Sequence, residues 1–174
     1  YINLLEKDEN SLKTPFDFIG VQNYTREVFK HNPFNPFLKI KQIPATKRTK
    51  ELTAMNWEIY PPSIYNVLKK INQYNTNIPL IITESGIALY DKMELNKVND
   101  QKRIEYYKAH LKQALKAKNE GIDLRGFFAW SLLDNFEWAE GYHPRFGLIH
   151  VDFHTKVRTP KNSANWFKDF LLDL

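Results

Sequence analysis

The sequence predicts a parallel α/β fold, and the prediction rests on three apolar runs and the segments that follow them. The runs cover residues 16–24, 79–84 and 124–133, and each is apolar on both faces, as strands of a covered parallel sheet are. A segment with the apolar spacing of a helix follows each run, so the order is βα, βα, βα with right-handed crossovers. No linker or low-complexity stretch divides residues 1–174, and we expect no separate second domain.

Each of the three helices is predicted from one apolar stripe. The first helix begins near Ser63, the second begins near Asp100, and the third follows the sequence RTPKNS. The second ends at Gly121, because glycine suits the left-handed position just after a helix. The stripes expected to face the core are Ile64, Val67, Leu68 and Ile71 in the first helix, Ile104, Tyr107, Leu111 and Leu115 in the second, and Ala164, Phe167, Phe170 and Leu171 in the third.

Three βα units leave two architectures open. They form either a small open α/β sheet or the last part of a (β/α)8 barrel, because eight units take about 250 residues and this chain has 174. In such barrels the functional side chains lie at the carboxyl ends of the strands. Here those positions carry Tyr24, Glu84 and Trp130, the last followed by the cluster DNFEWAEGY. We therefore expect the three strand ends to form the floor of one pocket, with the long segment 25–61 as its rim.

The composition narrows the possible partners. The 25 Lys and Arg residues outnumber the 20 Asp and Glu residues, but they are scattered and accompany no nucleic-acid motif. We therefore expect a solvated basic face and no nucleic-acid partner. No apolar run reaches the roughly 18 residues of a membrane span, so no membrane partner is expected. The five His residues show no ligand spacing with carboxylates, and we expect no metal and no other cofactor.

Two features bear on location. The first 13 residues, YINLLEKDENSLK, lack the basic, apolar and small-residue regions of a signal peptide, although the chain does not begin with Met, which leaves a targeting segment open. The chain contains no Cys, which excludes disulfides and thiol catalysis. Zero cysteines are compatible with the cytoplasmic location that we favour.

The residues expected around the pocket suit a sugar. Pyranose rings stack on aromatic side chains through their apolar faces, while their hydroxyls need carboxylate or amide partners, and Trp57, Trp130, Glu137 and Trp138 supply both kinds. A carboxylate fixed at a strand end, such as Glu84, suits a glycosidase nucleophile facing an oxocarbenium-like transition state. Two other interpretations stay open from the residues alone: a salt-bridged or capping carboxylate for Glu84, and ordinary core packing for the Trp residues.

Four stretches of the chain resemble motifs of glycoside hydrolase family 1, the β-glucosidase family. ITESG resembles the family's nucleophile motif I-T-E-N-G, and FAWSLLDNFEWAEGYHPRFGLIHVD is similar to its C-terminal signature over the whole length. FDFIGVQNYT is similar to the family's F-x-G-x-N-Y-Y-T segment, and KVRTPKNSANWF also fits. The resemblance covers nearly all of the chain, and it implies about the last three βα units of a (β/α)8 barrel.

The resemblance also implies roles for individual residues. Glu84 corresponds to the nucleophile, and Tyr24 to the tyrosine whose hydroxyl orients it. The implied substrate-binding residues are Trp130 as a platform under the sugar, Glu137 for O4 and O6, Trp138 for O3, Phe146 as an apolar wall, and Gln22 in place of the usual Asn. Gln22 is one methylene longer than Asn, so contacts near the 2-hydroxyl or the acid/base are expected to be rearranged. Ser85 also replaces an Asn, directly after the nucleophile position.

The family's acid/base motif, N-E-P, does not occur in this chain. A retaining site needs two carboxyl groups about 5 to 5.5 Å apart, so we expect the second in barrel units that are missing here and expect the isolated chain to be inactive. Glu137 implies an unphosphorylated β-glycoside or oligosaccharide as substrate, with glucose, galactose or fucose as glycon, because a carboxylate there would repel a 6-phosphate. The alternative is a non-catalytic carbohydrate-binding or receptor-like protein on the same scaffold. The absence of G-x-G-x-x-G disfavours a doubly wound nucleotide-binding module.

Overall fold

A three-stranded parallel sheet forms the centre of the structure. The computed structural model describes residues 15–74 and 77–173, so the prediction made for the first 13 residues lies outside the described residues. The strands are β1 (Ile19–Gln22), β4 (Leu80–Ser85) and β5 (Leu124–Ala129), in the order β1-β4-β5. Both pairings are parallel. The predicted α/β class and its strand direction are therefore confirmed.

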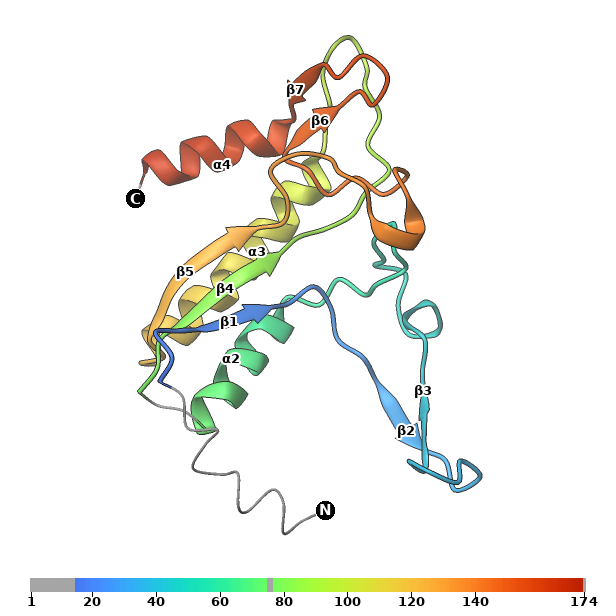
Figure 1. Ribbon diagram of the computed structural model, residues 1–174, viewed down its shortest axis with the longest axis vertical. Helices are drawn as coiled ribbons and strands as arrows, with labels where there is room; N and C mark the ends of the chain where they lie inside the picture. The colour runs from blue at the N-terminus through green and yellow to red at the C-terminus, as the bar shows by residue number, and fades with distance from the viewer. Residues whose placement is uncertain (1–14, 75–76, 174) are drawn as a thin grey trace.

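Three helices accompany the sheet. Figure 1 shows α2 (Pro62–Tyr74) and α3 (Gln101–Asn119) on one face of the sheet, and α4 (Asn162–Leu172) on the β5 side. Gly121 follows α3 with φ 95°, the left-handed conformation expected of it. Among the helices of the described residues, none is long and apolar enough to cross a membrane.

The strands are shorter than predicted where the chain leaves the sheet. β1 starts at Ile19 rather than at residue 16, and β5 ends at Ala129 rather than at residue 133. Beyond β5 the backbone changes partner: Ser131 N donates to Phe146 O at 3.4 Å, and Leu148 N donates to Ser131 O at 2.9 Å. Apolar composition does not reveal such a change of partner, because the residues before and after it are equally apolar.

Two antiparallel hairpins and two short 3-10 helices lie outside the sequence prediction. β2 (Phe29–His31) pairs with β3 (Ile40–Gln42), and β6 (Ile149–Val151) pairs with β7 (Arg158–Pro160). The 3-10 helices are η1 (Ala45–Lys47) and η2 (Trp138–Glu140). Strands of three residues offer too few positions for a period-two pattern to appear in the sequence. The β2–β3 hairpin extends away from the sheet (Figure 1).

The main core lies between the sheet and the helices α2 and α3. Its buried members are Val21, Ile64, Leu68, Leu80, Ile82, Ala114, Ala117, Ile122 and Leu124. A second cluster, formed by Ile87, Tyr106, Tyr107 and Leu148, lies under the carboxyl ends of the strands. The strand ends therefore rest on packed side chains, which gives any residue placed there a rigid support.

The predicted stripes of α3 and α4 are wrong at one residue each. Leu115 is 50% exposed and Leu171 is 55% exposed. In α3 the buried face is rotated toward polar residues, because Arg103 is fully buried and is neutralised by Asp91 and Asp100. A pattern search that admits only apolar residues to the core misses a face of this kind.

Candidate active site

The carboxyl ends of β1, β4 and β5 are tied together by the backbone. Asn23 N donates to Glu84 O at 2.9 Å, and Trp130 N donates to Ser85 O at 2.9 Å. In the strand register, Gln22 stands beside Glu84. The side chains that follow these strands therefore start from one edge of the sheet, as the carboxyl ends of parallel strands do.

Tyr24 and Glu84 are in direct contact. The Tyr24 hydroxyl donates to Glu84 Oε2 at 2.6 Å. Burial raises the pKa of Tyr24, and the hydrogen bond to Glu84 together with the charges of Glu84 and Glu137 raises it further. The phenol therefore keeps its proton at neutral pH and remains a donor to the carboxylate. This hydrogen bond fixes the orientation of the Glu84 carboxyl group.

The residues after Glu84 pack against the end of β5. Ser85 Oγ lies 3.2 Å from the hydroxyl of Tyr106, and both side chains are buried. A Cβ on Gly86 would lie 1.8 Å from Trp130 O, so only glycine permits this approach of the two strands. The peptide bond after Trp130 is cis, and Trp130 O accepts a hydrogen bond from Tyr107 at 3.2 Å. The sequence ESG therefore sets the carboxylate on a closely packed junction.

An aromatic wall stands beside the carboxylate. The ring centroids of Tyr24 and Trp57 are 5.6 Å apart, those of Tyr24 and Phe146 are 6.0 Å apart, and those of Trp57 and Phe146 are 6.3 Å apart. Phe146 is 2% exposed. Trp57 belongs to the segment 25–61, so the predicted rim contributes one side of this wall.

Glu137 is a second carboxylate near Glu84. It is 8% exposed, and its Oε1 has no hydrogen-bond partner among the described residues. Burial raises the pKa of Glu137, and the charge of Glu84 raises it further, while the side chains of Trp130 and Asn135 lower it. The negative charge of Glu84 therefore raises the pKa of both Glu137 and Tyr24.

Two predicted residues lie at the margin of this group. Trp138 is 86% exposed and has φ 47°, a backbone conformation that is uncommon for a residue other than glycine and that concentrates at functional sites. Gln22 is exposed at the end of β1. The structure therefore brings Tyr24 and Glu84 into contact and leaves Trp138 and Gln22 facing solvent.

A buried ion network lies behind the strand ends and consists of Asp91, Asp100, Arg103, Asp134 and Lys161. The sequence does not predict it. Lys161 Nζ donates to Asp91 Oδ2 at 2.5 Å and to Asp134 Oδ1 at 2.8 Å. Arg103 pairs with Asp91 at 2.8 Å and also with Asp100. No cluster within the described ranges is arranged to hold a metal ion, and the aspartates of the network are neutralised by Lys161 and Arg103. The pairs that Lys161 makes leave no sequence signal, because Asp91 and Asp134 come from distant segments.

Asp134 joins the buried ion network to the segment that carries the predicted sugar-binding residues. Its carboxylate accepts from Gly147 N at 2.9 Å, from Val151 N at 3.3 Å and from Arg145 Nη1 at 3.2 Å. A Cβ on Gly147 would lie 2.2 Å from Asp134 N, so the two chain segments meet backbone to backbone. Phe146 precedes Gly147, and its place in the aromatic wall is fixed through this contact.

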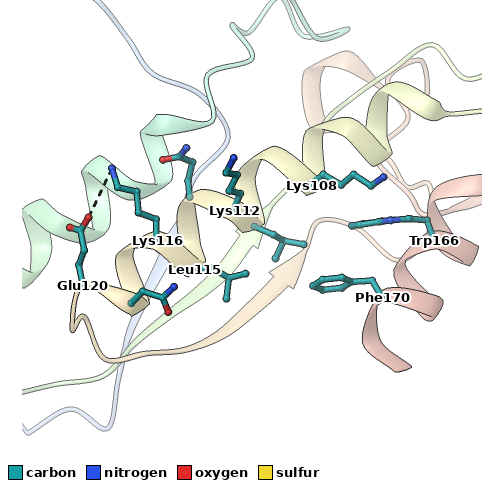
Figure 2. A pocket seen from close by; sticks show the side chains of 10 residues that line it. Lys108, Lys112, Leu115, Lys116, Glu120, Trp166 and Phe170 are labelled. Carbon is teal, nitrogen blue, oxygen red and sulfur yellow. Dashed lines mark ion pairs between the residues drawn. The ribbon is translucent and has the colours of Figure 1, made fainter. Parts of the chain in front are cut away.

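A hollow between α3 and α4 takes no part in this site. It has a volume of about 750 Å³, and its lining, shown in Figure 2, includes none of the predicted site residues. Lys108 Nζ lies 5.8 Å from the ring centroid of Trp166, and Lys116 pairs with Glu120 at 4.0 Å. The hollow belongs to the outer helical surface, whereas the carboxylates gather at the strand ends.

Comparison with known proteins relates this chain to a family of glycosyl hydrolases. The family model described as glycosyl hydrolase family 1 matches residues 1–173. Beta-glucosidase A of Thermotoga maritima is 42% identical over 163 residues, which are 93% of this chain and 36% of that protein. The 6-phospho-beta-galactosidase of Clostridium acetobutylicum is 43% identical over 117 residues, which are 67% of this chain and 25% of that protein.

A solved structure shows the same relation in three dimensions. The β-glucosidase of Thermotoga maritima in complex with deoxynojirimycin matches with a TM-score of 0.89 and 40% identity, over 97% of this chain and 37% of that one. The chain therefore spans little more than a third of the length of such relatives, and its open sheet corresponds to part of their (β/α)8 barrel.

Proposed function

Because the chain belongs to glycosyl hydrolase family 1, we propose that the complete protein is a retaining β-glycosidase of the β-glucosidase type. By complete barrel we mean this chain together with the N-terminal βα units of a family 1 enzyme. The observation that carries the proposal is the hydrogen bond of 2.6 Å between Tyr24 and Glu84 at the carboxyl ends of neighbouring parallel strands. A carboxylate held in this way, beside an aromatic wall, has the setting that a glycosidase nucleophile needs.

In the first step, a carboxylate oxygen of Glu84 attacks the anomeric carbon of the substrate. The bond from that carbon to the glycosidic oxygen breaks, and the leaving group takes a proton from a carboxylic acid that lies outside this chain. The product is a covalent glycosyl-enzyme ester on Glu84. Tyr24 donates to Oε2 and thereby keeps the carboxyl group oriented for the attack.

In the second step, water attacks the same carbon and releases Glu84. The water gives its proton to the carboxylate that acted as the acid, so the enzyme returns to its starting state. Two displacements at one carbon retain the β configuration. Since the acid/base is proposed to lie outside this chain, the isolated chain is expected to be inactive.

The sugar is proposed to lie between Glu84 and the segment 130–138. Glu137 is suited to O4 and O6, because its buried Oε1 has no partner among the described residues and burying an unpaired acceptor is costly. The remaining proposed contacts are Trp130 as a platform, Phe146 as an apolar wall, Trp138 as a donor to O3, and Gln22 near the 2-hydroxyl or the acid/base.

We propose an unphosphorylated glycon for this site. A 6-phosphate would come close to the carboxylate of Glu137, and like charges repel strongly where solvent is displaced. The similarity to a 6-phospho-beta-galactosidase makes this preference worth measuring directly. The choice among glucose, galactose and fucose stays open.

The test of the proposed function is chemical rescue of Glu84→Ala in the complete barrel. The variant should not hydrolyse an activated aryl β-glucoside in buffer, and should regain turnover when azide is added. The sugar azide should have the inverted, α configuration, because only one displacement occurs. Rescue with retention, or full activity without azide, would show that Glu84 is not the nucleophile.

A binding measurement on the unaltered barrel, made beside the rescue experiment, separates an enzyme from a carbohydrate-binding protein. A complete barrel that binds a β-glucoside by calorimetry but hydrolyses none, with Glu84 intact, would support the non-catalytic alternative. Hydrolysis by the unaltered barrel that disappears in Glu84→Ala would exclude that alternative.

A further inference from the structure

The segment 25–61 leaves the end of β1 and returns at the start of α2, and it is closed at its base by Glu58. Thr25 Oγ donates to the backbone oxygen of Glu58 at 2.8 Å. Arg26 donates from Nε and Nη2 to the two carboxylate oxygens of Glu58, each at 3.0 Å. Arg48 also donates to Glu58 Oε2. Two residues at the start of the segment are therefore attached to one residue near its end.

The attachment joins a buried acceptor to two cations, of which Arg26 binds it through two parallel hydrogen bonds. Glu58 is 7% exposed, and Arg26 lies with its guanidinium 3.5 Å from the ring centroid of Tyr60. The hydrogen bond from Arg26 lowers the pKa of Glu58 despite its burial, and the one from Arg48 lowers it as well. Bidentate Arg–carboxylate pairs fix geometry as well as charge.

The attachment is adjacent to Tyr24 on one side and to Trp57 on the other. Thr25 and Arg26 directly follow Tyr24, and Glu58 directly follows Trp57, so the pairing holds these two rings at their centroid distance of 5.6 Å. β1 ends at Gln22, the last backbone hydrogen bond to β4 is the one from Asn23 N to Glu84 O, and the pairing of β1 does not extend to Tyr24. The position of Tyr24 therefore depends on the side-chain attachments around it.

The preceding residue is attached separately. Asn23 N donates to Glu84 O at 2.9 Å, and Asn23 Oδ1 accepts from Ser63 Oγ at 2.8 Å. Tyr24 is thus held from both sides, by Asn23 toward the sheet and by the Glu58 attachment toward the rim. The β2–β3 hairpin extends away from the sheet beyond this point (Figure 1), so the Glu58 attachment lies between the hairpin and Tyr24 along the chain.

We propose that Glu58 is a positioning residue for the reaction: through Thr25 and Arg26 it holds the Tyr24 hydroxyl on Glu84. The inference rests on the proposed function, since the effect is exerted on the proposed nucleophile. Glu58 touches no substrate in this account and acts only through Tyr24.

The experiment compares Glu58→Gln with the unaltered complete barrel. Gln keeps the shape of the side chain and the backbone oxygen that Thr25 binds, but it removes the charge and one acceptor of the Arg26 fork. We expect kcat/KM on an aryl β-glucoside, expressed per titrated active site, to fall about tenfold, the change that one lost charge-assisted hydrogen bond produces. Asp123→Asn, which breaks the exposed pair with Arg125, is the matched control and should leave kcat/KM within twofold.

A double-mutant cycle with Tyr24→Phe decides between positioning and general stabilisation. If Glu58 acts through Tyr24, Glu58→Gln should change kcat/KM by less than twofold in the Tyr24→Phe background. Independent, multiplicative losses would overturn the proposal, and so would an unchanged per-site kcat/KM in Glu58→Gln alone. Should Glu58→Gln not fold, Arg26→Lys replaces it in the same cycle, because Lys keeps the charge and loses the fork.

Failure of this inference is distinguishable from failure of the proposed function. If the unaltered barrel hydrolyses the aryl β-glucoside and the Glu84→Ala variant does not, the proposed function stands, whatever the result for Glu58. If the Glu84→Ala variant stays active, Glu84 is not the nucleophile, and the inference about Glu58 fails with the proposed function.

Discussion

The buried ion network and the strand ends both hold carboxylates away from solvent, and they satisfy them in opposite ways. In the buried ion network, Asp134 and Asp91 accept from Lys161, and Asp91 also pairs with Arg103. At the strand ends, Glu84 accepts from the neutral hydroxyl of Tyr24, and no ion pair of Glu84 or Glu137 occurs among the described residues. The aspartates of the network are paired with cations, whereas the carboxylates at the strand ends are not.

The difference follows from what burial costs. A buried carboxylate needs a counter-charge or several donors, and removing one partner of a buried pair costs about 3 to 5 kcal/mol. The aspartates of the network meet this requirement within the chain. Glu84 is half-buried and Glu137 is buried, and neither pairs with a cation among the described residues, a setting that concentrates at functional sites. The network is therefore expected to govern stability, and the strand ends to govern chemistry.

The largest effect is expected from Glu84→Gln in the complete barrel. Hydrolysis of an aryl β-glucoside should fall by several orders of magnitude, since an amide does not replace a carboxylate nucleophile. The midpoint of thermal unfolding should change little, because Tyr24 can still donate to the amide oxygen. A Gln variant with unaltered kcat/KM would contradict the claim that the strand ends govern the chemistry.

Asp134→Asn should have the converse effect. The substitution leaves Lys161 with Asp91 as its one anionic partner in the network, leaves Arg145 without its carboxylate, and weakens the acceptor for Gly147 N, so the free energy of unfolding should fall by about 3 to 5 kcal/mol. Denaturant unfolding measures the change, and Asp123→Asn at an exposed pair is the control that should change it by less than about 0.5 kcal/mol. Equal stability of the two variants would mean that the network is not structural.

His110 should make stability fall in mild acid. Burial lowers the pKa of His110 to about 4, from the ordinary 6.5, and its ring is fully buried against Tyr106. Between those values the unfolded chain binds a proton that the folded chain does not, so stability decreases as pH falls through this window, by about 3 kcal/mol in all.

The measurement is the unfolding midpoint of the complete barrel from pH 7 to pH 4. His110→Phe keeps the stacking on Tyr106 and should lose less stability over this range than the unaltered protein. His31→Gln, at an exposed position of β2, is the control and should follow the unaltered protein. If His110→Phe loses as much stability over this range as the unaltered protein, the pH response belongs to other groups.

Glu137→Ser should have the smallest effect of the four and the most specific one. Removing the carboxylate should lower kcat/KM for an unphosphorylated β-glucoside about tenfold or more, and should raise the relative activity on the 6-phosphoglucoside. Parallel kinetics on the two substrates measure the preference. An unchanged ratio would place Glu137 away from the glycon.

The sequence predicts the strand ends better than the network behind them. Glu84 and Tyr24 were predictable because each follows an apolar run, and parallel strands bring their carboxyl ends to one edge. The partnership of Lys161 with Asp91 spans 70 residues, and nothing local in either segment indicates it. The same is true of Glu58 and Arg26, whose pairing depends on how a long segment folds back.

The buried face of α3 shows why the helix prediction was only partly right. Ile104 and Tyr107 are buried as the apolar spacing predicts, but Arg103 and His110 are buried beside them. The burial of Arg103 is compensated by its ion pairs with Asp91 and Asp100. His110 is buried as a neutral imidazole, because burial lowers its pKa. Such compensation is a property of the tertiary structure and cannot be read from the period of one helix.

The most direct test of the central claim is to trap the glycosyl-enzyme. A 2-deoxy-2-fluoro β-glucoside with a good leaving group slows both displacements, because fluorine destabilises the oxocarbenium-like transition states, but lets the first one proceed. Incubation with the complete barrel, followed by digestion and mass spectrometry, should find one fluoroglucosyl group on the peptide that contains Glu84, and none in Glu84→Gln. A label on another carboxylate, or an active enzyme that never acquires a label, would contradict the account.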